Sequence, residues 1–276
     1  MFLRMAGAAL ALAGTGGLTD AYAWNVEPNM LVLEEVRVRL PRLPQAFDGL
    51  VIGFLSDFHV NGPSSPALTA RAAEMLMAHQ PDLVALGGDY ITRSADDTAS
   101  CADALAKLRA PLGVYGILGN HDYWAGDTER TVAALTRVGI RILRNESLVI
   151  GSGSNPVFLI GLDDVWEQHA DLPHALLGVP PDACKIVLVH EPDFADAAAK
   201  EEVALQLSGH SHGGQVRLPL IGAPILPYLA TRYPIGLQRA GPFTQVYTTR
   251  GVGLIKPAVR FNCPPEVTIL RLQAGT

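Results

Sequence analysis

Five short polar motifs, each placed directly after an apolar run, constrain this 276-residue chain more than any other feature. In chain order they are Ser56-Asp57-Phe58-His59, Gly87-Gly88-Asp89, Gly119-Asn120-His121-Asp122, Val189-His190-Glu191 and Gly209-His210-Ser211-His212-Gly213-Gly214. An apolar run that ends in such a motif is typical of a buried strand that presents a ligand at its C-terminal end. Carboxylate, amide and imidazole groups on separate strands, with one carboxylate to bridge, are what a site for two metal ions needs.

The alternation of apolar and amphipathic segments predicts an α/β fold with two sheets. Strands are expected at residues 31–40, 50–55, 83–86, 114–118, 140–143, 145–150, 157–160, 185–189 and 203–207, and again between 245 and 272. Helices are expected at residues 66–80, 95–108, 128–138, 166–177 and 193–200. The first strand alternates charged and apolar residues, as an edge strand does. Strands that alternate with helices early and follow one another later suggest two sheets packed face to face, with helices outside.

The composition favours one large domain and argues against nucleic acid as a partner. Hydrophobic residues make up 49% of the chain and charged residues 17%, which supports a well-buried core rather than disorder. The formal net charge of −6 disfavours a non-specific grip on a phosphate backbone. Cys101, Cys184 and Cys263 share no metal-type spacing and are interpreted as small buried residues, with a single disulfide left open. We expect one domain over residues 24–276.

The first 23 residues differ from the rest of the chain. Arg4 precedes an apolar run of small residues, 6–18, which is followed by Ala21-Tyr22-Ala23. This pattern is that of a short signal-peptide core with an A-x-A exit, and it is too short for a comfortable transmembrane helix. We expect residues 1–23 to be an export signal or a membrane tether, which places the protein in the cell envelope or periplasm. A buried N-terminal helix is the alternative, and the glycine-rich stretch 14–17 counts against it.

The order D-x-H, GD, GNHD, H and GHxH, which runs from Asp57 to His212, resembles the calcineurin-like metallophosphoesterase superfamily. The resemblance implies a four-layer α/β/β/α sandwich of two mixed sheets flanked by helices. It also implies two divalent metal ions bridged by Asp89. The first ion would be held by Asp57, His59 and His212, and the second by Asn120, His190 and His210. Such mixed ligands suit Mn, Fe or Zn, and the sequence does not select among them.

The same resemblance implies hydrolysis of a phosphoric ester, with a phosphodiester favoured over a monoester. A hydroxide that bridges the metals would attack phosphorus in line. His121 follows a ligand without being one, and we expect it to donate a proton to the leaving oxygen or to act as a charge partner for the phosphoryl group. Asp122 would orient His121 through its other ring nitrogen. A structural role for His121 is the alternative, and the alternative for the whole chain is a non-catalytic metal-binding scaffold of the same fold.

Several polar residues are placed outside the expected centre. Asp163 and Asp164 follow a predicted strand near the same edge, and we expect a solvated turn there, with support of the site or contact with substrate as the alternative. Glu191 is left out of the site although it adjoins His190. The histidines without a motif are expected on the surface or on a helix face, and they are His79, His169 and His174.

The segment 218–237 follows the last motif and is rich in proline and apolar residues, with Arg232 as its single charge. Its prolines disfavour a helix or strand. It is either a loop folded onto the surface of the domain or an apolar rim that accepts acyl chains or touches a membrane. The sequence GHSHGGQ followed by Arg217-Leu218-Pro219 resembles the exported, cell-envelope branch of the superfamily. That branch implies a lipid-linked substrate such as UDP-diacylglucosamine, with Arg217 or Arg232 as candidate phosphate contacts.

Overall fold

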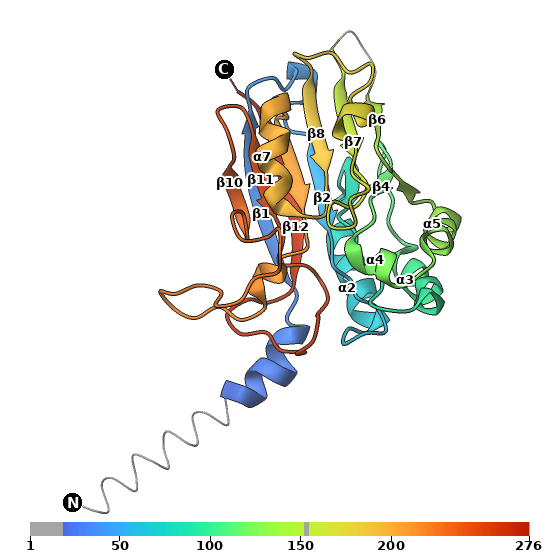
Figure 1. The fold of residues 1–276 in the computed structure, drawn as a ribbon, viewed down its shortest axis with the longest axis vertical. Coiled ribbons are helices and arrows are strands. Elements are labelled where there is room, and N and C mark those ends of the chain that lie inside the picture. The colour runs from blue at the N-terminus through green and yellow to red at the C-terminus, as the bar shows by residue number, and fades with distance from the viewer. Residues whose placement is uncertain (1–18, 152–154, 276) are drawn as a thin grey trace, which may run out of the picture.

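The structure is a computed structural model that describes residues 19–151 and 155–275, and it contains two six-stranded mixed sheets packed face to face (Figure 1). In sheet order the first contains β1 (Val32–Leu40), β12 (Glu266–Ala274), β2 (Val51–Leu55), β3 (Leu83–Leu86), β4 (Val114–Gly116) and β5 (Arg141–Ile142). The second contains β10 (Gly236–Arg239), β11 (Gln245–Thr248), β9 (Leu205–Ser208), β8 (Cys184–Leu188), β7 (Val157–Gly161) and β6 (Glu146–Ile150).

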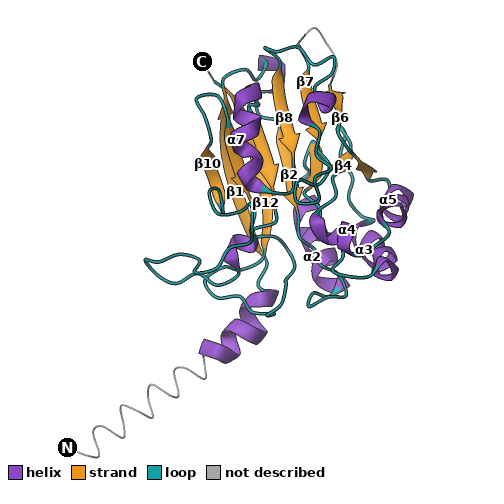
Figure 2. Ribbon diagram, viewed as in Figure 1, coloured by secondary structure: helices purple, strands orange, loops and turns teal. Residues whose placement is uncertain are grey.

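Helices cover the outer face of each sheet, as Figure 2 shows. Those beside the first sheet are α2 (Pro66–Met77), α3 (Thr98–Leu105), α4 (Asn120–Trp124) and α5 (Thr128–Arg137), and those beside the second are α6 (Leu172–Ala175) and α7 (Ala195–Ala198). Apolar side chains from α2, α3 and α5 share a core with the first sheet, and those from α6 and α7 share one with the second. The expected four-layer α/β/β/α sandwich is confirmed.

Strand β2 shows why its sequence is apolar throughout. Ile52 and Phe54 point into the core between the sheets, whereas Leu55 points into the core beneath the helices. Successive side chains of a strand alternate between its faces, and both faces of β2 are covered, so each position must be apolar. The neighbouring β3 and β4 run parallel to β2, and β7, β8 and β9 run parallel to one another. The carboxyl ends within each set therefore lie at one edge.

Helix α2 begins where its sequence predicts. The Ser65 hydroxyl accepts a hydrogen bond from Leu68 N at 3.3 Å, and Pro66 occupies the first turn. A serine cap satisfies a backbone N–H that has no partner within the helix, and proline fits the first turn because that position needs no N–H donor. The predicted edge position of the first strand is also confirmed, because β1 ends the order of its sheet.

Three sequence-based expectations differ from the structure, and two elements have no counterpart among them. The helix expected at 166–177 is limited to α6, because the backbone before it turns around Asp164, whose carbonyl accepts from His169 N and Ala170 N. The helix expected at 193–200 is α7 between two 3-10 turns. The strands expected across 245–272 are interrupted by a long loop between β11 and β12. Edge strand β10 and the short helix α4 were not predicted.

The expected leader falls mainly on residues 1–18, which lie outside the described residues. In the described part, helical residues 19–21 lead into a π-helical turn, Tyr22–Val26, and a 3-10 turn, Glu27–Asn29. None of the helices within residues 19–151 and 155–275 has the length and apolar character needed to cross a bilayer.

The core between the sheets should carry much of the stability of the fold. Leu159 on β7 is 1% exposed, whereas Leu177 after α6 is 71% exposed. Replacing Leu159 by alanine removes buried contacts and leaves a cavity, so it should lower the free energy of unfolding by about 2–5 kcal/mol. Leu177→Ala is the matched control and should change it by less than about 0.5 kcal/mol. Urea titration measures both, and equal effects would contradict this assignment of the core.

Candidate metal centre

The seven predicted metal ligands all lie on loops that follow the carboxyl ends of strands. Asp57 and His59 follow β2, Asp89 follows β3, and Asn120 begins α4 after β4. From the second sheet, His190 follows β8, and His210 and His212 follow β9. All seven side chains are buried. The two sheets therefore bring residues that are up to 155 positions apart in sequence into one polar cluster.

Short distances join these side chains into a single cluster around Asp89. Its Oδ2 lies 3.4 Å from His59 Nε2 and 3.2 Å from His190 Nε2. On the other side, His212 Nε2 lies 3.5 Å from Asp57 Oδ1 and 3.1 Å from His59 Nε2. Ligand atoms of Asp57, His59 and His212 all lie within 4.8 Å of one another, and so do those of Asp57, Asp89 and His190. The two groups share Asp57, and Asp89 of the second group lies 3.4 Å from His59 of the first.

Hydrogen bonds to backbone carbonyls fix the orientation of the imidazole rings. His190 Nδ1 lies 2.7 Å from Gly87 O, which directs Nε2 toward Asp89. His210 Nε2 lies 2.8 Å from Tyr228 O, and the ring packs against that of His190 at 5.0 Å between centroids. An imidazole that donates one N–H to a carbonyl offers its other nitrogen as a lone pair, the form in which histidine binds metals. His190 thus directs Nε2 toward Asp89, whose charge raises the pKa of His190, and His210 offers Nδ1.

The donor set fits a pair of metal ions. Within the part of the chain that the structure describes, Asp57 Oδ2 and Asn120 Oδ1 are buried without a hydrogen-bond partner. Such atoms are rare in folded proteins, because each loses its hydration without compensation. Hard carboxylate and amide oxygens combined with imidazole nitrogens are ligands for ions such as Mn, Fe or Zn. The residues present therefore match the group that the fold implies.

Five of the seven ligand-type residues have left-handed backbone conformations. Their φ angles are 55° for Asp57, 48° for His59, 56° for Asp89, 66° for His210 and 50° for His212. For residues other than glycine this conformation costs on the order of 1 kcal/mol or more each. Strain of this kind persists where a site requires a fixed geometry. Gly88, at φ 91°, completes the turn, and a Cβ there would lie 2.7 Å from Gly119 N.

Burial and neighbouring charges set the protonation of the cluster. Burial lowers the pKa of His59 to about 3 and that of His210 to about 4. Burial alone would raise the pKa of Asp89, but His190 and the other nearby histidines hold it well below its usual value. The carboxylate of Asp89 is therefore charged, while His59 and His210 are neutral at neutral pH. Those are the forms that bind metal ions.

Asp122 differs from its expected role as the residue that orients His121. Its Oδ2 accepts backbone N–H groups from Asp89 and Gly119, both at 3.0 Å, and its Oδ1 accepts from Tyr90 N at 2.9 Å. The His121 ring is instead held by Thr92, whose carbonyl oxygen lies 2.9 Å from Nδ1. Asp122 comes just after His121 in a helix and points back into the loops. Asp122 therefore fixes the backbone that presents Asp89, and it does not orient the imidazole of His121.

The expectation of a solvated turn at Asp163 and Asp164 is wrong, because both are buried. Asp163 accepts from the Tyr123 hydroxyl at 2.6 Å and pairs with Arg144 at 2.8 Å. Asp164 accepts from Glu167 N at 2.7 Å, and burial together with Glu191 raises its pKa to about 9. The partners of Asp163 are 40 and 19 positions away in sequence, so no local pattern reveals its burial.

A row of aromatic rings, held at Trp166 by Glu191, lies beside the metal-ligand cluster. Glu191 accepts backbone N–H groups of Val165 and Trp166, and the Trp166 ring lies 5.5 Å from those of His210 and Tyr228. Trp124 joins Trp166 at 5.4 Å and His121 at 4.6 Å. Edge-to-face contacts thus run from His121 to His210 along one side of the cluster.

Arg260 is a structural support that the sequence did not reveal. Its side chain is fully buried and donates to the carbonyl oxygens of Cys263, Arg250, Gly251 and Gly253. The loop it holds donates Val252 N to Ser56 O and Gly253 N to Asp57 O. A Cβ at Gly251 would lie 2.7 Å from that of Asp57, so glycine is needed there for close approach. A lone arginine without a motif normally lies on the surface, which is why it escaped notice.

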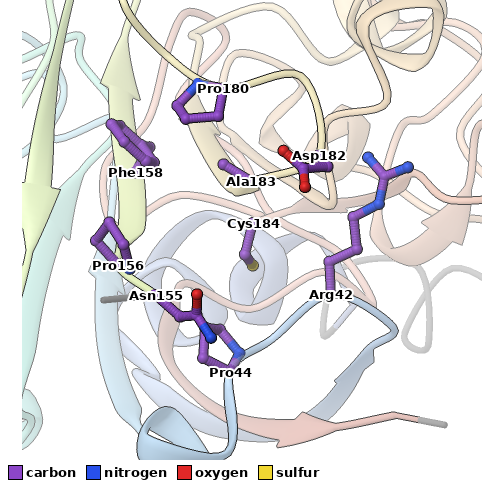
Figure 3. A pocket seen from close by; sticks show the side chains of 9 residues that line it. All are labelled: Arg42, Pro44, Asn155, Pro156, Phe158, Pro180, Asp182, Ala183 and Cys184. Atoms are coloured by element: carbon purple, nitrogen blue, oxygen red, sulfur yellow. The ribbon is translucent and has the colours of Figure 1, made fainter. Parts of the chain in front are cut away.

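Two cavities border the cluster. One of about 400 Å³ lies beside His121, and an apolar one of about 260 Å³ lies beside His212. A third, of about 430 Å³, lies at the opposite ends of β7 and β8 among Arg42, Phe158 and Cys184 (Figure 3). It contains none of the five motifs, so its size alone does not mark it as the functional site. All three cysteines are free and buried, which confirms their expected character.

Comparisons with known proteins agree with this geometry. Residues 50–214 match the model of the family "Calcineurin-like phosphoesterase". The uncharacterized metallophosphoesterase YkuE of Bacillus subtilis is 34% identical over 99% of this chain and 96% of its own length. The phosphodiesterase YaeI of Escherichia coli is 33% identical, covering 98% and 97%. The UDP-2,3-diacylglucosamine pyrophosphatase LpxG of Chlamydia muridarum is 28% identical, covering 92% and 93%. The chain therefore belongs to the calcineurin-like phosphoesterase family, which confirms the expected class of phosphoric ester hydrolase.

Proposed function

We propose that this chain is a dinuclear metal-dependent phosphodiesterase in which His121 assists the leaving group. The observation that carries the proposal is the gathering of seven buried ligand-type side chains at one edge of the two sheets, where Asp89 contacts His59 and His190, with a half-buried histidine directly beside them. Asp57, His59 and His212 would hold one ion, Asn120, His190 and His210 would hold the other, and Asp89 would be shared between them. Mn, Fe and Zn all suit this ligand set. A bound pair of ions activates water and neutralises charge on the phosphoryl oxygens.

The setting of His121 supports its role as proton donor. Thr92 O lies 2.9 Å from Nδ1, which leaves Nε2 for the substrate. A ring nitrogen of His121 also falls within 4.8 Å of the ligand atoms of His59 and Asp89. An acid in this position reaches the oxygen that leaves phosphorus. Asp122 takes part indirectly, by holding the backbone of Asp89 and Gly119.

Two substitutions separate metal binding from proton transfer. Asp89→Ala removes the shared carboxylate and should abolish both metal binding and hydrolysis of bis-p-nitrophenyl phosphate. His121→Ala should keep the metal content of the wild type and lower kcat by about 10²–10⁴. Elemental analysis and the release of p-nitrophenol measure the two properties on one preparation. Full activity in Asp89→Ala would exclude the assignment, and loss of metal in His121→Ala would make that residue a ligand.

The surface next to the centre supports a lipid-linked substrate. The apolar cavity beside His212 is walled by Pro224, Leu226, Ile255 and Val259. The loop that forms it exposes Leu220, Ile221, Ile225 and Tyr228. An exposed apolar patch beside a reactive centre is where an acyl chain would bind. The related LpxG is named for a diacylated substrate, so a UDP-diacylglucosamine-like diester is one candidate for this chain.

Leu226 lies in the wall of this apolar cavity and offers a direct test. Leu226→Gln places a polar group where an acyl chain would bind, and it should lower kcat/KM for a diacylated phosphodiester about tenfold relative to bis-p-nitrophenyl phosphate. Leu237→Gln, on strand β10 and outside the cavity, is the matched control and should leave the ratio unchanged. An unchanged ratio in Leu226→Gln would remove the support for acyl binding at this cavity.

We propose further that the protein is exported to the cell envelope or attached to a membrane through residues 1–23, with residues 24–276 as the metallophosphoesterase domain. The leader-like sequence and relatives named as transmembrane proteins support this location. Expression of the full chain followed by fractionation should place it in the envelope or periplasm, and sequencing should show whether the leader is removed. Full-length protein that keeps Met1 and occurs only in the cytoplasm would refute export.

A further inference from the structure

The cavity beside His121 is built from three loops that meet next to the candidate centre. The loop after β2 supplies Asn61, Gly62 and Pro63, and the loop after β3 supplies Thr92 and Arg93. Asp97 comes from the 3-10 turn that follows, and Ile255 and Lys256 come from the loop before β12. Its volume of about 400 Å³ is in the range of small-molecule sites. Because His121 forms part of its wall, the cavity lies on the side to which the leaving part of a substrate would point.

Hydrogen bonds tie these walls to the centre. Thr92 O lies 2.9 Å from His121 Nδ1, so the residue before Arg93 is fixed to the imidazole. A Cβ at Gly62 would collide with the Thr92 hydroxyl, so the two loops are in close contact. On the opposite wall, Leu254 N donates to the Ser64 hydroxyl at 2.7 Å, which anchors the loop that carries Lys256. Arg93 and Lys256 are therefore attached to walls of fixed position.

The charge balance of the cavity favours an anion. Within the described residues, neither Arg93 nor Lys256 has a protein hydrogen bond or ion pair, whereas Arg130 and Arg144 pair with acidic residues. Asp97 is the single acidic residue in the wall, and its Oδ1 accepts from Asn61 Nδ2 at 3.0 Å. Two cations thus face one carboxylate that already has a donor. A guanidinium and an ammonium are both suited to phosphate oxygens.

We propose that this cavity is a subsite for a phosphate-type group on the leaving part of the substrate, with Arg93 and Lys256 as specificity-determining residues. The inference rests on the proposed phosphodiesterase activity and on the position of His121 at the leaving side. Such a subsite would make the enzyme prefer diphosphate diesters to simple phosphodiesters as substrates. In that reaction the oxygen of water joins one phosphorus, and the bond from this phosphorus to the bridging oxygen breaks. The electron pair stays on the bridging oxygen, and the protons of water pass to the two phosphate products or to solvent.

A matched pair of substrates tests the subsite. Bis-p-nitrophenyl phosphate and P1,P2-di(p-nitrophenyl) diphosphate carry the same end groups and differ by one phosphate in the leaving part. The measured quantity is the ratio of kcat/KM for the diphosphate to kcat/KM for the diester, in metal-loaded full chain. Arg93→Gln and Lys256→Gln should each lower this ratio about tenfold, and high salt should weaken the effect by screening. Asp97→Asn should raise the ratio, because it removes the opposing charge.

Arg71→Gln is the control, since Arg71 is an exposed arginine on α2 outside the cavity. It should leave the ratio unchanged. A ratio that also stays unchanged in Arg93→Gln and Lys256→Gln, even with equal losses on both substrates, would overturn the subsite while leaving the phosphodiesterase intact.

Calorimetric binding of p-nitrophenyl phosphate tests the subsite without turnover. If the wild type hydrolyses neither substrate, the proposed function fails. If the wild type and both variants then bind p-nitrophenyl phosphate with equal affinity, the subsite is overturned as well.

Discussion

The buried carboxylate of Asp89 is the interaction on which the rest of the centre depends. It lies at the end of a strand of the first sheet, and it contacts His59 from the same sheet and His190 from the other. A negative charge in this position would be strongly disfavoured unless positive charge and hydrogen-bond donors surrounded it. His121 N donates to Asp89 Oδ1 at 2.9 Å, and Asp122 holds the Asp89 backbone. The two sheets must therefore stay in register for the site to exist.

The fold tolerates this costly arrangement because the strained ligand-type residues lie in loops at one edge of the sheets. Left-handed backbone at five ligand-type residues is held by hydrogen bonds from neighbouring loops, including those that Arg260 and Asp122 organise. Beneath the loops, the core between the sheets is apolar and continuous from Val38 to Leu272. Apolar burial supplies the main stabilisation of such a domain, and part of it is offset by strained, desolvated functional groups. The ligands are thereby pre-organised before any ion or substrate arrives.

The sequence predicted what depends on local pattern and missed what depends on distant partners. Apolar runs ending in Asp57, Asp89 or His190 located both the strands and their ligands, because burial on both faces leaves no polar position until a strand ends. Asp164 and Arg260 were missed because neither belongs to a recognisable motif, and the loops that bury them are irregular backbone with no periodic pattern. Asp122 was assigned to its sequence neighbour His121, although helix geometry directs it to the loop of Asp89 instead. The edge strand β10 was missed because its half-exposed residues give little apolar signal.

The cavities on either side of the centre connect this geometry to the choice of substrate. One cavity is apolar and adjoins His212. The other adjoins His121 and carries Arg93 and Lys256, which have no partner among residues 19–151 and 155–275, and Ile255 and Lys256 border both cavities. A substrate with an apolar part and a charged leaving part would fit across them.

Each interpretation assumes two ions at the centre, so metal stoichiometry is the most direct test. Elemental analysis with anomalous diffraction on the full chain should find two transition-metal ions, one on each side of Asp89. A chain that binds none after purification with added Mn(II) would contradict the account and leave a scaffold of the same fold.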